Sequence, residues 1–213
     1  MKENVAKESL AYTITFKDPP SGIATTDRVL VHVENSYSLR NLTGTPGKGY
    51  EIHLGLSSYE VVGIYPRFTV LSINREIQDL KKATVTPGTI KRVLSLPAEG
   101  HTEVTIGYEA LYKLRDAESF ITEVPAERLI VTVSNQVPEK IHQFNFDTIH
   151  RIGEASHPME GMWVFDHALL PGHGFALSWS PDTKKVLAAD HETPPNPPES
   201  SHTGPPPSTP KAE

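Results

Sequence analysis

The sequence predicts an all-β protein, an antiparallel β-sandwich built either as one large sandwich or as two consecutive small ones. Three observations lead to this fold class. Short segments such as residues 11–16, 104–109 and 129–133 alternate apolar and polar side chains, which is the period of a half-buried strand. The stretches between such segments are rich in Pro and Gly, as turns are. Almost no segment shows the period of an amphipathic helix.

The strands follow one another at a regular spacing that is typical of sandwiches and barrels. They are expected at residues 10–17, 28–34, 36–42, 50–56, 59–65, 67–73, 89–96, 102–113, 117–123, 128–134, 141–147, 161–166 and 173–179.

One parity of each strand is apolar and is predicted to face the core, because successive side chains of a strand point to opposite sides of the sheet. The inward set comprises Tyr12, Ile14, Phe16, Val29, Val31, Val33, Tyr50, Ile52, Leu54, Leu56, Val104, Ile106, Tyr108, Leu129, Val131, Val133, Phe175, Leu177 and Trp179. Residues 74–82 form the one segment that could make a short helix.

Pro125 interrupts the strand pattern, and a new strongly β segment begins after it. We therefore place an N-terminal β portion at residues 10–123 and a C-terminal β portion at residues 124–181. Residues 182–213 are predicted to be a disordered, Pro-rich C-terminal tail, since eight of the 19 prolines fall within the last 24 residues and almost no apolar residue accompanies them.

Composition excludes several functional classes. The 26 acidic and 20 basic residues give a net charge of −6, so no nucleic-acid partner is expected. The chain has no cysteine, which excludes disulfides, thiolate nucleophiles and Cys-type zinc sites. No segment resembles a signal peptide or a membrane span, so a soluble cytoplasmic protein is expected. No cofactor motif is present, and neither a phosphate-binding loop nor a Gly-x-Ser-x-Gly elbow occurs.

Histidines are concentrated late in the chain. Half of the ten lie between residues 142 and 173, among several carboxylates, and this residue mixture suits a zinc-type metal site. The candidate ligands are His142, His150, His157, His167 and His173. Their spacing matches no compact ligand motif, and loop or rim positions are the simpler interpretation.

Aromatic residues of two late strands form a second candidate site. Trp163, Phe165 and Trp179, with His167 and His173 on a hairpin-like connection at residues 166–174, could line an apolar ligand pocket with polar tips. The alternative is that the rings anchor the core of the second portion, which is the usual place for side chains of this size.

Three stretches carry a family resemblance: residues 94–108, 120–133 and 170–179. With their Pro-x-x-Gly turn and a closing strand that runs from Gly174 to Trp179, they resemble the β-rich C-terminal regions of some bacterial helix-turn-helix regulators. The resemblance covers about residues 90–180. It implies a non-catalytic sensing or interaction role and brings no catalytic residues with it.

These observations favour a non-catalytic interaction or ligand-sensing module whose partner is a protein or a small ligand. Two alternatives stay open. One is a metal-dependent hydrolase using the histidine-rich region, and the other is a structural or assembly component that associates through exposed strand edges.

Overall fold

The computed structural model confirms an all-β architecture. It describes residues 4–23, 27–46, 49–56, 60–86, 88–98, 100–149, 156–159 and 161–181. The tail predicted at residues 182–213 lies outside the described residues. Within them, the only helix is α1 (Leu80–Ala83), which begins after Asp79, whose carboxylate accepts a hydrogen bond from the Lys81 amide.

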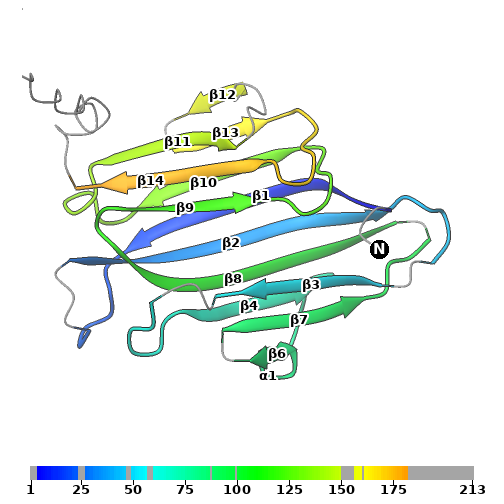
Figure 1. Ribbon diagram of the computed structural model, residues 1–213, viewed down its shortest axis with the longest axis horizontal. Helices are drawn as coiled ribbons and strands as arrows, with labels where there is room; N and C mark the ends of the chain where they lie inside the picture. The colour runs from blue at the N-terminus through cyan, green and yellow to red at the C-terminus, as the bar shows by residue number, and fades with distance from the viewer. Residues whose placement is uncertain are drawn as a thin grey trace, which may run out of the picture. The chain divides into compact units, whose positions relative to one another are not determined.

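The largest sheet forms one layer (Figure 1). Its strand order is β12 (Ser156–Met159), β13 (Met162–Phe165), β10 (Leu129–Asn135), β1 (Val5–Lys17), β2 (Arg28–Asn41), β8 (His101–Lys113), β4 (Arg67–Ile73) and β5 (Glu76–Ile77). All neighbouring strands are antiparallel except β1 and β10, which run parallel.

Two small antiparallel sheets complete the sandwich. Their strand orders are β11 (Gln143–Ile149), β14 (Gly174–Ser180) and β9 (Asp116–Ile121) in one, and β3 (Tyr50–Gly55), β7 (Thr89–Leu94) and β6 (Thr84–Thr86) in the other. Rings from β1 contact rings from β14, with centroids 5.3 Å apart for Tyr12 and Phe175 and 5.0 Å apart for Phe16 and Trp179. Both small sheets contribute side chains to the same hydrophobic core as the large sheet.

Most of the residues that the sequence predicts to face the core are buried. On β2, for example, Val29, Val31 and Val33 are at most 2% exposed. Leu54 and Val133 are only partly buried and pack at the margin of the core. Burial of one apolar face per strand therefore stabilises the sandwich, as expected for antiparallel sheets.

Some predicted strand limits are wrong. The strands expected at residues 28–34 and 36–42 are one continuous strand, β2. Where a strand is expected at residues 59–65, the described part is a tight turn in which Val62 and Tyr65 exchange backbone hydrogen bonds. In place of the expected helix at residues 74–82, the structure has a β-turn, the strand β5 and the start of α1.

The portions predicted at residues 10–123 and 124–181 both contribute strands to the large sheet. Strand β10 pairs with β1 over seven residue pairs, from Leu10 with Leu129 to Phe16 with Asn135. Met1–Thr183 forms one compact unit, and the predicted boundary lies inside it.

The connection at residues 166–174 is not a hairpin. Strand β13 pairs with β10 in the large sheet, whereas β14 pairs with β9 and β11 in a small sheet. The connection therefore crosses from one layer to the other, and a turn-rich sequence does not distinguish such a crossing from a hairpin.

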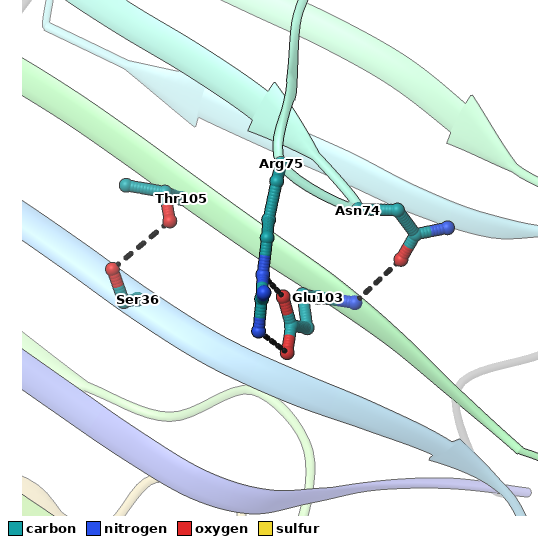
Figure 2. Close-up of polar contacts among 5 residues, drawn as sticks. All are labelled: Ser36, Asn74, Arg75, Glu103 and Thr105. Atoms are coloured by element: carbon teal, nitrogen blue, oxygen red, sulfur yellow. Dashed lines mark hydrogen bonds and ion pairs between the residues drawn. The ribbon is translucent and has the colours of Figure 1, made fainter.

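The turn between β4 and β5 is bonded to Glu103 of β8 (Figure 2), and the side chains of Arg75 and Glu103 are both exposed. Asn74 and Arg75 both adopt positive φ, 50° and 68°, as a two-residue hairpin turn requires. The Asn74 side chain accepts a hydrogen bond of 2.9 Å from the Glu103 amide, and the Arg75 guanidinium donates to both carboxylate oxygens of Glu103. In the described part of the chain, no helix is long and apolar enough to cross a membrane.

Candidate functional site

A cleft of about 320 Å³ lies between the two small sheets. Its lining residues come from the edge strands β3 and β9, which form the walls, and from β1, β2 and β8 of the large sheet, which form the floor. We call it the tyrosine cleft, because its lining includes Tyr12, Tyr37, Tyr50 and Tyr108, together with Asn35 and Phe120.

The strand register places a polar side chain in the middle of the floor. Asn35 of β2 lies opposite Tyr12 on β1 and opposite Ile106 on β8. It occupies the inward parity of β2, between Val33 and Tyr37. Its Oδ1 atom is buried and has no hydrogen-bond partner among the described residues. A buried acceptor without a partner costs free energy.

The hydroxyls of Tyr12, Tyr37 and Tyr50 stay protonated well above neutral pH. Burial raises the pKa of the Tyr50 hydroxyl to about 12, with a further contribution from the negative charge of Glu123. Burial likewise raises the pKa of Tyr12 and Tyr37 above the ordinary phenol value of 10.0. Each of these hydroxyls can therefore donate a hydrogen bond at physiological pH.

A β-bulge turns Lys7 toward the cleft. Lys7 lies opposite Leu39 and Ser9 lies opposite Ser38, so Glu8 is an extra residue in β1. Without this bulge, the alternation set by Leu10 would place Lys7 on the outer face. Instead Lys7 is 6% exposed, and its ammonium lies 4.4 Å from the centroid of the Tyr37 ring. The floor thus already holds one cation against an aromatic face.

The loop after β9 fixes this bulge. The Lys7 amide donates to the carbonyl oxygen of Pro125, and the Lys7 carbonyl accepts from the amide of Glu127, both at 2.8 Å. The same loop carries Glu123, which lines the cleft. An ammonium and a carboxylate therefore enter the cleft lining from segments that are far apart in the sequence.

The aromatic residues proposed from the sequence occupy different surroundings. Phe165 and Trp179 are 1% and 3% exposed and belong to the core, and the Trp179 Nε1 donates to the carbonyl oxygen of Lys113. Trp163 is half-buried and stacks on Phe146, with ring centroids 4.6 Å apart. His167 is exposed.

His173, on the connection before β14, is partly buried, and its carbonyl accepts from the Thr122 amide. Trp163 and His142 line a second hollow of about 680 Å³, together with Phe144 and Ile141. Trp163 belongs to the predicted ligand pocket and His142 to the predicted metal site, so this hollow brings together one residue of each candidate site. A shared pocket for Trp163, Phe165, His167, His173 and Trp179 stays a prediction.

The predicted metal site is only partly described. His150 lies outside the described residues, and His157 lies on β12, whose side chains are not described. Among the residues whose positions are described, no three His, Asp or Glu side chains come together as a metal site. Metal ligation that includes His150 or His157 stays a prediction.

The tyrosine cleft is not predicted from the sequence, although one signal is available there. Asn35 is a polar residue among the otherwise apolar inward positions of β2. In the sequence alone, its polarity suggests a break between one strand at residues 28–34 and another at residues 36–42. A polar residue at an inward position of a continuous strand is instead an indication of a site.

No family model matches the chain, and no curated protein matches it. Solved structures with a similar chain trace include a nutrient-binding protein candidate from Legionella pneumophila, with 10% identity, a TM-score of 0.49, and coverage of 84% of this chain and 68% of that one. Aminopeptidase A of the same species has 10% identity and a TM-score of 0.48, over 84% of this chain and 22% of the enzyme. Leukotriene A4 hydrolase of Saccharomyces cerevisiae has 9% identity and a TM-score of 0.44, over 83% of this chain and 29% of the enzyme.

Proposed function

We propose that this protein is a non-catalytic binding module that takes its ligand in the tyrosine cleft. The observation that carries the proposal is the buried, unpartnered Oδ1 atom of Asn35 in the lining of that cleft. A polar group kept at a cost to stability is expected where a ligand uses it. Rotation of the amide about its last side-chain torsion would turn either of its polar atoms toward a ligand.

The size and chemistry of the cleft support binding. A volume of about 320 Å³ is near the lower end of the range for ligand pockets. Aromatic faces supply apolar contact area, while the hydroxyls of Tyr12, Tyr37 and Tyr50 supply directional donors. The raised pKa of these phenols suits hydrogen-bond donation and opposes a role as bases at neutral pH.

The test is a binding screen with defined probes on matched variants. Butylammonium, butyrate, phenol and short neutral and charged peptides are titrated by ligand-observed NMR. Leu54→Trp adds an indole to a half-buried wall position of the cleft, and Thr13→Trp adds the same group to the exposed, opposite face of β1. Binding that Leu54→Trp abolishes and Thr13→Trp preserves supports the proposal. Absence of binding by every probe, or equal binding to both variants, overturns it.

A further inference from the structure

We propose that the ligand of the tyrosine cleft is an extended peptide that pairs with the open edge of β3 and directs a lysine or arginine side chain onto the tyrosine floor. This inference rests on the proposed function and names the class of ligand. It follows from the hydrogen-bonding state of the two wall strands and from the charges that face the cleft.

The open edge of β9 is partly protected against strand pairing. The Thr122 amide, just after β9, donates to the His173 carbonyl on the β14 side, so Phe120 and Glu118 also turn their backbone groups toward β14. The backbone groups of Ile121, Ser119 and Ala117 therefore face the open side. Two of these three amides are already used by the preceding side chains: Ser119 N–H donates to Glu118 Oε1 at 3.2 Å, and Ala117 N–H donates to Asp116 Oδ1 at 3.0 Å. An edge with most of its donors occupied by its own carboxylates is a poorer template for another strand than an edge whose donors are open.

The open edge of β3 is different. The Leu56 amide donates to the carbonyl oxygen of Gly88, so alternate residues back along β3, Leu54 and Ile52, turn their backbone groups toward β7. Glu51 and His53 then turn theirs toward the cleft, where β3 has no neighbouring strand among the described residues. This edge offers both donors and acceptors, which is what an added strand needs.

The charges that face the cleft favour a cation. Glu118 and Glu123 line it on the β9 side, and the Glu118 carboxylate accepts from the hydroxyl of Tyr112, a neutral group. The third lining carboxylate, Glu51, forms an ion pair of 2.9 Å with Lys91. Against the two carboxylates of the β9 side stands one lining ammonium, that of Lys7. The influence of Glu123 on the pKa of Tyr12, Tyr37 and Tyr50 agrees with a negative potential at the floor.

The floor is also the right surface for a basic side chain. Alternate side chains of a strand added beside β3 would point at the large sheet, where the row formed by Tyr12, Asn35 and Ile106 lies. The Lys7 ammonium over the Tyr37 ring shows an alkylammonium already packed in this way. A ligand ammonium or guanidinium would meet aromatic faces, an amide acceptor and a lining of net negative charge.

The test uses peptides that separate charge from strand pairing. The probe is N-acetyl-Val-Thr-Lys-Thr-Val-amide, compared with its norleucine analogue, with its analogue N-methylated on lysine and its two neighbours, and with butylammonium. Titrations follow the backbone amide signals of β3 in the full chain. We expect the lysine peptide to bind about tenfold more tightly than the norleucine and N-methylated analogues. Glu123→Gln should remove most of the preference for lysine, and Glu139→Gln, at an exposed position outside the cleft lining, should preserve it.

A variant of the edge itself completes the test. His53→Pro removes an amide that faces the open side and leaves the ladder to β7 intact, since proline is tolerated at such edge positions. It should weaken the lysine peptide about tenfold, while His53→Ala should not. If His53→Pro does not fold, the N-methylated peptide gives the same answer.

Three outcomes overturn the inference. Equal binding of the lysine and norleucine peptides removes the charge argument, and the proposed function survives if Leu54→Trp still blocks both. Butylammonium as strong as the lysine peptide makes the ligand a small organic cation. A dimer in sedimentation that His53→Pro dissociates makes a second copy of the chain the occupant of the edge.

Discussion

Asn35→Leu should stabilise the protein and abolish ligand binding in the tyrosine cleft. Leucine has nearly the size and branching of asparagine but no polar atoms. In this variant, a leucine side chain lies between Tyr12 and Ile106 in the row across the floor, and the row is apolar except for one hydroxyl.

The magnitude follows from the state of Oδ1. A buried acceptor without a partner costs about 1–3 kcal/mol, and the leucine removes this cost. The compact unit spans Met1–Thr183, and in a unit of this size each kcal/mol changes the melting temperature by about 2–4 °C. The expected rise in melting temperature is therefore about 2–12 °C.

Asn135→Leu is the matched control. Asn135 is a partly buried amide on β10 whose two ends are both bonded: its Nδ2 donates to the Ile141 carbonyl at 2.9 Å, and its Oδ1 accepts from the Val137 amide at 3.1 Å. Leucine there removes two hydrogen bonds and should lower the stability by about 1–3 kcal/mol. Calorimetry and urea titration on the two variants give changes of opposite sign. A loss of stability in Asn35→Leu as large as that in Asn135→Leu would refute the reasoning, because Asn35 would then be a satisfied structural residue.

Two further predictions concern the alkaline limit of stability and a close backbone approach. Because the pKa of Tyr12, Tyr37 and Tyr50 is raised in the folded state, the unfolded chain loses these protons first. The contribution of these three hydroxyls to the free energy of unfolding should be constant below pH 10 and fall as the pH rises toward 12 and beyond. The fall should be shallower in Tyr50→Phe, which lacks one of the three hydroxyls. Absorbance at 295 nm should show these phenolates forming together with unfolding measured by circular dichroism, and separate formation before unfolding contradicts their burial. Gly174→Ala should destabilise by about 3 kcal/mol in urea titration, because its methyl group would lie 1.8 Å from the Phe120 carbonyl oxygen; a neutral result means that β9 and β14 can separate locally.

The fold class could be predicted because each strand carries its own signal. Alternation along a segment such as residues 11–16 requires only that one face be buried, and Tyr12, Ile14 and Phe16 are indeed buried. Pairing is a property of the whole chain and has no such local signal. Nothing in the residues of β1 and β10 indicates that they pair in parallel across more than a hundred intervening positions, or that β13 and β14 belong to different layers.

The tyrosine cleft could not be predicted for a similar reason. Clusters of His and Trp are conspicuous in the sequence, yet Phe165 and Trp179 are core residues. The tyrosine cleft draws its lining from five strands and the loop after β9, and each strand contributes residues that suit an ordinary core when taken alone. Tyr12 lies beside Asn35 only because of the register in which β1 pairs with β2. The lining of the cleft could therefore not be predicted before the strand pairing was known.

Three departures from an ideal sandwich meet at the tyrosine cleft. The bulge at Glu8 turns a lysine inward, Asn35 leaves an acceptor unpartnered on an apolar face, and β9 uses its own carboxylates to occupy two of its edge amides. Each departure costs stability or regularity, and a sandwich selected for stability alone has no reason to keep all of them at one place. Bulges and unpartnered polar groups also concentrate at binding sites in other proteins, because they aim side chains that regular strands cannot aim. The coincidence of the three features, more than any one residue, is the reason for proposing a ligand in the cleft between β3 and β9.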